Sequence, residues 1–149
     1  MRNYFATVIC LLALSHAANA QEFKAPPWFS ASRCTRDKSE AADRDLDGLL
    51  DWAAVYRTFK LYKQCDDGGT AEGYSDAVAI LLTKHWSSVG VLARLARSNP
   101  EFGDFVLLHV DSLMSPDQAR TIASNAEKHC PVGAKEMCKR LGAKAGNPW

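Results

Sequence analysis

Apolar residues recur at steps of three and four along most of this chain, and this spacing is what most constrains its fold. Between residues 46 and 63 it produces one apolar helical face, made of Leu46, Leu49, Leu50, Ala53, Tyr56, Phe59 and Tyr62. Such spacing is typical of an amphipathic α-helix, whereas a half-buried strand would alternate at every second residue. No segment alternates for long enough to indicate a strand. The sequence therefore predicts an all-α fold.

Further helices are predicted for residues 70–86, 89–96, 99–110, 115–129 and 134–141. Three of them begin at capping residues, namely Thr70, Asn99 followed by Pro100, and Ser115 in a Ser-Pro-Asp-Gln capping box. Gly142 is expected to end the last helix, and residues 143–149 are expected to form a flexible tail. Together these segments predict a compact bundle or an orthogonal array of about five to six helices.

The first 20 residues have the three parts of a secretory signal peptide. Arg2 supplies the positive charge, residues 4–14 form a short apolar run, and Ala18-Asn19-Ala20 is a small-x-small cleavage site. A membrane anchor would need about 20 apolar residues, and His16 interrupts the run before that length is reached. We therefore expect cleavage after Ala20, no membrane insertion of the mature chain, and a periplasmic or secreted protein.

The mature chain is expected to form a single helical domain over residues 37–142. Residues 21–36 precede this domain as an extended arm, because Pro26 and Pro27 disfavour a helix there. The whole chain has 18 basic and 17 acidic side chains, and cleavage would remove one basic residue, Arg2. Since the mature chain has no excess of positive charge, no nucleic acid is expected as a partner.

Four cysteines remain after cleavage, since Cys10 belongs to the signal peptide. An even number of cysteines in an exported chain favours two disulfides, for which three pairings are possible. A zinc site is the alternative, but it requires closely spaced pairs such as Cys-x-x-Cys, which the sequence lacks. A proline–glycine turn at residues 131–133 can bring two cysteines within bonding range, so local pairing is favoured. The predicted disulfides are Cys34–Cys65 and Cys130–Cys138.

Asp43, Asp45 and Asp47 alternate ahead of a glycine, as in the first half of a calcium-binding EF-hand loop. Asp51 stands at the ninth position of such a loop and could supply a further oxygen ligand. The twelfth position is Ala54, however, where an EF-hand loop places a bidentate glutamate. The alternative interpretation, which we favour, is a helix N-terminus whose acidic residues complement the helix dipole. Calcium is the one cofactor that the sequence suggests.

The segment from residue 65 to residue 72 is the predicted binding surface. A disulfide at Cys65 would make the turn that follows it rigid, and rigid exposed loops are suited to binding. The carboxylates of this segment could instead act as general acid and base in a small hydrolase, or could be ordinary turn and helix-start residues. The residues predicted to contact a partner are Asp66, Asp67, Gly68, Gly69 and Glu72.

A hydrolase of this kind would also need a histidine, and the mature chain offers His85, His109 and His129. Each lies near the C-terminal end of a different predicted helix, where a protonated histidine complements the helix dipole. We favour that structural role for all three. No motif of a serine hydrolase, a zinc protease or a phosphate-binding loop is present, and oxidised cysteines would provide no nucleophile. The sequence thus favours a non-catalytic protein.

Two further features are interpreted as packing. Gly73 lies inside a predicted helix, where glycine costs about 0.5–1 kcal/mol relative to alanine, so we expect another segment to approach the backbone closely there. Trp28, Trp52 and Trp86 are expected in the core rather than in a ligand-binding cage, because aromatic side chains dominate the cores of small domains.

Several of these elements together resemble the Tai-type immunity proteins of bacterial type VI secretion. They are Cys65-Asp66-Asp67-Gly68 followed by Glu72-Gly73-Tyr74 and Ala77, the helix after Asn99-Pro100-Glu101, and Cys130-Pro131. Those immunity proteins are small, exported, all-helical and disulfide-bonded, and they bind and block a peptidoglycan amidase effector in the periplasm. The resemblance covers roughly half of the mature chain, and the Trp86 segment and Cys138 lie outside it. It implies a non-catalytic inhibitor that binds another protein and inserts its Asp66–Gly69 turn into the cleft of that enzyme.

Overall fold

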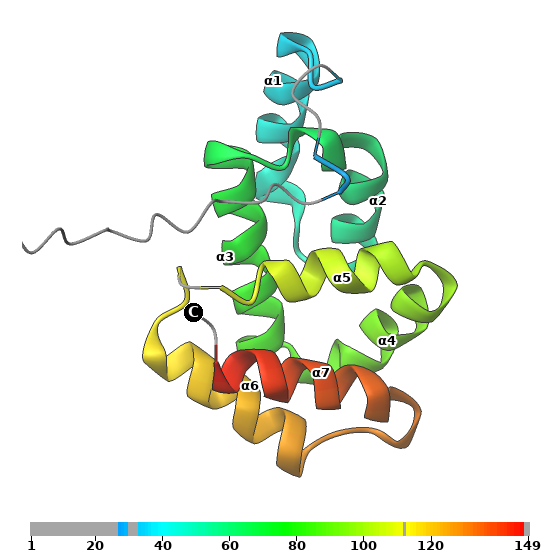
Figure 1. Ribbon diagram of the computed structural model, residues 1–149, viewed down its shortest axis with the longest axis vertical. Helices are drawn as coiled ribbons and strands as arrows, with labels where there is room; N and C mark the ends of the chain where they lie inside the picture. Colours follow the sequence, from blue (N-terminus) through cyan, green and yellow to red (C-terminus); the bar gives the residue numbers. More distant parts are fainter. Residues whose placement is uncertain (1–26, 30–32, 112, 148–149) are drawn as a thin grey trace, which may run out of the picture.

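The computed structural model describes residues 27–29, 33–111 and 113–147, and these residues form an all-α fold without strands (Figure 1). The expected signal peptide and its cleavage site lie outside the described residues. Seven α-helices and four short 3-10 helices follow one another along the described part of the chain: α1 Arg36–Asp45, η1 Leu46–Gly48, α2 Trp52–Tyr62, η2 Lys63–Cys65, α3 Gly68–Lys84, η3 Trp86–Ser88, α4 Val89–Ser98, α5 Pro100–Leu108, α6 Pro116–Lys128, η4 Val132–Ala134 and α7 Lys135–Gly146.

The helices form two groups that are joined by the long helix α3. α1 and α2 lie at one end of the molecule, and α6 and α7 lie side by side at the other, with α3 running between the two groups (Figure 1). Both predicted disulfides are confirmed. The Cys130–Cys138 bridge closes the connection between α6 and α7, with a Cα–Cα distance of 6.1 Å. The Cys34–Cys65 bridge joins the segment before α1 to the end of η2.

The predicted caps of α5 and α6 are confirmed. The Asn99 side chain accepts a hydrogen bond from the backbone N–H of Phe102, and Pro100 occupies the first position of α5. Ser115 and Gln118 form the reciprocal hydrogen bonds of a capping box at the start of α6. These starts were predictable because a cap acts on backbone groups only two or three residues away.

The first helical region begins earlier than expected and is divided. Residues 36–45 form α1, although the sequence predicted an extended arm up to residue 36 and no helix before Leu46. α1 is strongly polar and buries only Ala42, so it lacks the apolar stripe that would have revealed it. The predicted continuous helix from Leu46 is interrupted, because Asp51 caps a new helix by accepting a hydrogen bond from Ala54 N–H at 2.7 Å.

The last helix ends later than expected. α7 continues through Gly142 to Gly146, so residues 143–146 are helical and the prediction of a flexible tail starting at residue 143 is wrong for them. Tertiary packing outweighs the glycine here. A Cβ added at Gly142 would lie 3.4 Å from the Cβ of Ala126 in α6, and Ala145 is buried one turn later.

A cluster of aromatic side chains fills the core between α2, α3 and α5. Phe59, Tyr74, Phe102 and Phe105 are fully buried, and the rings of Phe59 and Tyr74 both lie 4.9 Å from the ring of Phe105. Trp28 continues this cluster at 5.8 Å from Phe105, so the segment before α1 contributes to the core. Trp28 and Trp52 are buried as predicted, and Trp86 is half-buried.

The close approach expected at Gly73 is confirmed, and its partner is Leu46. A Cβ at Gly73 would lie 2.5 Å from Cδ1 of Leu46 and 3.1 Å from its Cγ, so the whole isobutyl group would have to move. We expect Gly73→Ala to lower the free energy of unfolding by about 1 kcal/mol, because this clash exceeds the gain in helix propensity. In a Leu46→Ala background the same substitution should be stabilising. Urea unfolding of the four proteins checks this, and the same sign in both backgrounds would contradict it.

Candidate functional site

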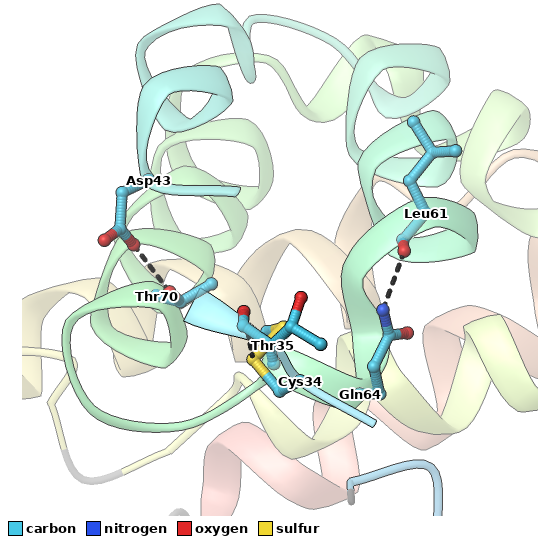
Figure 2. Close-up of a disulfide and its surroundings, with 7 residues drawn as sticks. Cys34, Thr35, Asp43, Leu61, Gln64 and Thr70 are labelled. Carbon is cyan, nitrogen blue, oxygen red and sulfur yellow. Dashed lines mark hydrogen bonds between the residues drawn. A yellow bond between two sulfur atoms is a disulfide. The ribbon is translucent and has the colours of Figure 1, made fainter. Parts of the chain in front are cut away.

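The loop between η2 and α3 is fixed to the body of the protein at its first residue. Cys65 is buried and forms the disulfide with Cys34, at a Cα–Cα distance of 4.9 Å (Figure 2). This bond ties the loop to the segment that precedes α1. Beside it, the hydroxyl of Thr70 donates a hydrogen bond to Asp43 at 2.6 Å, which joins the first turn of α3 to α1 (Figure 2).

The other end of the loop is shaped by the start of α3. Asp67 is the N-cap residue, and its side chain accepts a hydrogen bond from Gly68 N–H at 2.9 Å. Gly68 has a φ of +50°, a left-handed conformation that residues with a Cβ rarely adopt. The prediction that Thr70 caps this helix is wrong, because the helix begins two residues earlier and Thr70 is buried within it.

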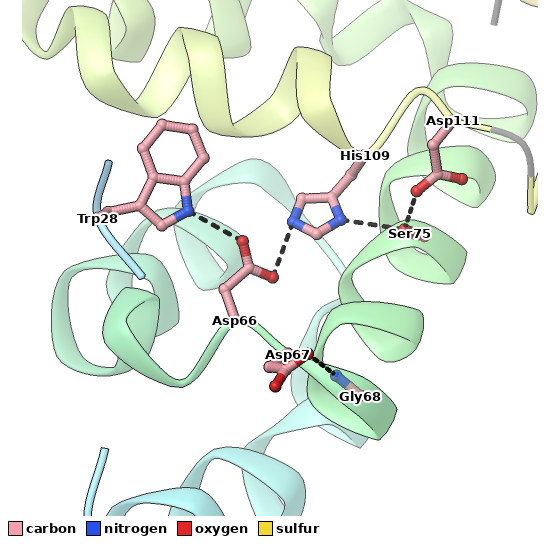
Figure 3. A network of polar contacts seen from close by, with 7 residues as sticks. All are labelled: Trp28, Asp66, Asp67, Gly68, Ser75, His109 and Asp111. Carbon is pink, nitrogen blue, oxygen red and sulfur yellow. Dashed lines mark hydrogen bonds and ion pairs between the residues drawn. The ribbon is translucent and has the colours of Figure 1, made fainter. Parts of the chain in front are cut away.

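Asp66 lies under the loop and is almost completely buried, with 6% of its surface exposed. Trp28 Nε1–H donates a hydrogen bond to its Oδ2 at 2.9 Å, and His109 Nε2 lies 3.2 Å from its Oδ1 (Figure 3). Neither His109 Nε2 nor Asp66 Oδ1 has a hydrogen-bond partner among the described residues, so each depends on the other for compensation of its burial. The expected role of Asp66 in contacting a partner is therefore corrected: its carboxylate faces inward and positions the loop.

The network continues beyond His109 to the start of the next loop. His109 Nδ1 lies 3.0 Å from the hydroxyl oxygen of Ser75 in α3 (Figure 3). The Ser75 hydroxyl donates a hydrogen bond to Asp111 Oδ2 at 2.8 Å, and Asp111 Oδ1 accepts one from the backbone N–H of Leu113. Residues far apart in the sequence are thus joined in one chain of polar contacts through the interior.

The hydrogen bonds of Ser75 indicate which nitrogen of His109 carries a proton. Ser75 has a single hydroxyl proton and gives it to Asp111, so the contact between His109 Nδ1 and Ser75 requires a proton on Nδ1. His109 Nε2 lies within ion-pair distance of the Asp66 carboxylate, and the two groups form an ion pair when both ring nitrogens carry a proton. The ring of His109 is therefore held between Ser75 of α3 and Asp66 of the loop.

Tyr74 lies on the aromatic side of this ion pair. Its ring centre is 5.6 Å from that of His109, and its hydroxyl is buried without a partner among the described residues. Burial, and then the negative charge of Asp66, raise the pKa of the Tyr74 hydroxyl well above its ordinary value. The hydroxyl therefore stays neutral, and Tyr74 adds no second negative charge beside Asp66.

The contacts run in the order Asp66, His109, Ser75, which is also the order of a hydrolase triad. In a triad the serine hydroxyl donates to the histidine, which acts as its base, whereas Ser75 donates to Asp111. Ser75 is also only 3% exposed. Of the predicted hydrolase pairs, the structure brings Asp66 and His109 together, while Asp67 and Glu72 lie exposed and apart from this pair.

The remaining predicted contact residues share the surface above Asp66. Asp67, Gly68, Gly69 and Glu72 are all exposed around the start of α3. A hollow of about 260 Å³, lined in part by Asp67, Gly68 and the disulfide, opens beside them. The backbone of this surface is therefore fixed from below, while the side chains of Asp67 and Glu72 are exposed above it.

The four carboxylates considered for calcium do not form a group placed to hold a metal within the described ranges. Asp43 and Asp45 belong to α1 and not to an open loop, and they stand at its C-terminal end rather than at the helix N-terminus that we favoured. Asp43 accepts the hydrogen bond from Thr70, and Asp51 caps α2. Asp47 lies in η1.

The three histidines all follow helix C-termini, as the sequence predicted. His85 and His129 are exposed there. His109 has more than the expected interaction with the helix dipole, because it is only 2% exposed and lies against Asp66. A signal for this was present in the sequence. His109 continues the spacing of the buried Phe102 and Phe105, which places it on the inner face of α5.

Comparisons with family models, with curated proteins and with solved structures found no match. The resemblance to Tai-type immunity proteins therefore stays a prediction from the sequence. In the part of the chain that the structure covers, no helix combines the length and the apolar character needed to cross a bilayer. The two disulfides are of the kind that forms in oxidising compartments.

Proposed function

We propose that this protein is exported and acts as a non-catalytic inhibitor that binds a cell-wall amidase through the surface of Asp67, Gly68, Gly69 and Glu72. The signal peptide expected from the sequence, the two disulfides and the resemblance to Tai-type immunity proteins all support this proposal. Blocking such an enzyme requires a segment that keeps its shape while it occupies the cleft, because ordering a flexible loop on binding would weaken the complex.

The observation that carries the proposal is the burial of Asp66 beneath an exposed turn. Burying a carboxylate lowers stability unless the carboxylate has polar partners. Asp66 has two, since it lies 3.2 Å from His109 and accepts a hydrogen bond from Trp28. The disulfide holds the same turn one residue earlier. The disulfide, His109 and Trp28 thus hold the segment 65–69 from below, while Asp67, Gly68 and Gly69 are exposed. This is the arrangement expected of a preorganised binding loop.

Affinity capture tests this function. The full-length chain is exported by a bacterial host, immobilised and incubated with extract of the native cells, and retained proteins are identified and assayed for peptidoglycan amidase activity. We expect one exported amidase at a 1:1 ratio. Glu72→Arg should reduce its retention at least tenfold, because hot-spot contacts typically contribute more than about 1.4 kcal/mol each.

Glu127→Arg in α6 is the matched control for this charge reversal. Glu127 is exposed on α6, at the opposite end of the molecule from the start of α3, so retention should be unchanged. An equal effect of the two substitutions would point to non-specific electrostatic binding. Retention of no amidase by the unsubstituted protein would contradict the proposed function.

The order of Asp66, His109 and Ser75 makes a serine hydrolase the second function to be tested. Its test is labelling with a fluorophosphonate probe, which reacts with activated serines. We expect no labelling of Ser75, because its hydroxyl is buried and donates to Asp111 instead of His109. Labelling that disappears in Ser75→Ala and in His109→Gln would instead support the hydrolase.

A further inference from the structure

A groove beside α3 collects two of the six large apolar side chains that are exposed among the described residues. Leu50 is 78% exposed and Ile80 is 50% exposed, and both line a hollow of about 380 Å³ between the η1 segment and α3. Its floor is apolar and buried, since Leu49, Ala77 and Leu81 form it. Large apolar side chains at the edge of an apolar hollow are typical of surfaces that bind another molecule.

The groove is part of the fold and does not depend on flexible side chains alone. The backbone at Gly73 allows Leu46 to lie directly against α3, which brings the whole η1 segment to the side of this helix. Leu50 lies two residues after the end of η1 and immediately before Asp51, the N-cap residue of α2. The space between Leu50 and Ile80 is therefore set by a backbone-to-side-chain contact beneath it.

The ionisable side chains that line the groove are two carboxylates and one histidine. Asp47 and Asp76 line it together with His85, and no lysine or arginine does. Both carboxylates are exposed, and neither forms an ion pair or a side-chain hydrogen bond with another described residue. An apolar side chain that is flanked by positive charge would complement this arrangement.

The groove and the loop surface lie on one face of α3. Gly69, Gly73, Asp76 and Ile80 follow one another at steps of four, three and four residues, which is the spacing of neighbours along a helix face. Glu72, which we place in the partner-binding surface, lies beside this stripe. A protein that covers Gly69 and Glu72 can therefore reach the groove by extending along the same face of α3.

We propose that this groove receives one apolar side chain of the partner protein, flanked by lysine or arginine, as a second contact beside the loop surface. The proposal rests on the proposed inhibitory function for the identity of the partner. The apolar side chain packs between Leu50 and Ile80, and the flanking cation lies near Asp47 and Asp76. The loop blocks the enzyme, and the groove determines which enzyme is recognised.

Peptide probes test the groove without the partner. The ¹⁵N-labelled protein is titrated with acetyl-Gly-Lys-Leu-Lys-Gly-amide and with acetyl-Gly-Glu-Leu-Glu-Gly-amide, which carries the same apolar side chain between acidic ones. We expect saturable shifts of the Gly73, Asp76 and Ile80 amide signals with the lysine peptide, and at least fivefold weaker binding of the glutamate peptide. No shifts, or equal shifts with the two peptides, would overturn the proposal.

The captured amidase provides a second measurement that separates this proposal from the inhibitory function. Ile80→Ala and Asp76→Lys should each weaken its affinity at least tenfold. Leu61→Ala, at a leucine of α2 that is 57% exposed, should change the affinity less than twofold. If Glu72→Arg weakens binding but both groove variants bind normally, the groove proposal fails and the inhibitory function stands. If no amidase binds but the lysine peptide does, the inhibitory function fails and the groove stands.

Discussion

Replacing Asp66 with alanine is expected to lower the free energy of unfolding by about 3–5 kcal/mol, as is usual when one partner of a buried ion pair is removed. The substitution leaves the buried Nε2 of His109 without a polar partner, since it has no other among the described residues. It also removes the acceptor of the Trp28 indole N–H. Urea unfolding at neutral pH, followed by far-ultraviolet circular dichroism, measures the change.

Asp67→Ala is the control for this experiment. The neighbouring carboxylate is exposed and caps α3, so its removal should cost only about 1 kcal/mol. A double-mutant cycle with Asp66→Asn and His109→Gln should give a coupling energy of about 1–3 kcal/mol. Similar losses for Asp66→Ala and Asp67→Ala, together with a coupling near zero, would show that no buried ion pair stabilises the loop.

Removing the Cys34–Cys65 disulfide is expected to have the second large effect. The double substitution Cys34→Ala/Cys65→Ala should lower the free energy of unfolding by about 3.5 kcal/mol, and Cys130→Ala/Cys138→Ala by about 2.5 kcal/mol. The two bonds join cysteines that are 31 and 8 residues apart, and the longer closed loop restricts the unfolded chain more. A larger loss for the shorter loop would contradict this explanation.

Hydrogen exchange distinguishes the local effect of the two disulfides. Without the Cys34–Cys65 bond, the loop is no longer tied to the segment before α1, so the amides of residues 66–69 should exchange at least tenfold faster. Loss of the Cys130–Cys138 bond should leave these amides unchanged, because that bond lies between α6 and α7. Equal protection in the two variants would mean that the disulfide does not hold the loop.

Most of the fold was predictable because its signals are local. The apolar spacing of the helices and the caps at Asn99 and Ser115 depend on residues within one or two turns, and the two disulfide pairings join neighbouring parts of the chain. α1 was missed because it buries only Ala42. The end of α7 was misplaced because contact with Ala126 of α6 outweighs the helix-ending tendency of Gly142.

The candidate site could be predicted only in part. The loop was located from its cysteine, its carboxylates and its glycines. The sequence did not indicate that Asp66 faces inward and Asp67 outward. Trp28, His109 and Asp66 are brought together by tertiary packing across 38 residues or more, and no sequence pattern encodes such a meeting. The spacing that placed His109 on the inner face of α5 indicated burial but not a partner.

Inhibition of the captured amidase tests most directly whether the rigid loop is a blocking element. Hydrolysis of purified peptidoglycan is measured while the protein is added in increasing amounts, with Glu72→Arg and Glu127→Arg titrated in parallel. We predict that activity falls to zero at one equivalent of the unsubstituted protein and of Glu127→Arg, and that Glu72→Arg needs at least tenfold more. Full amidase activity in the presence of excess bound protein would contradict the proposed function.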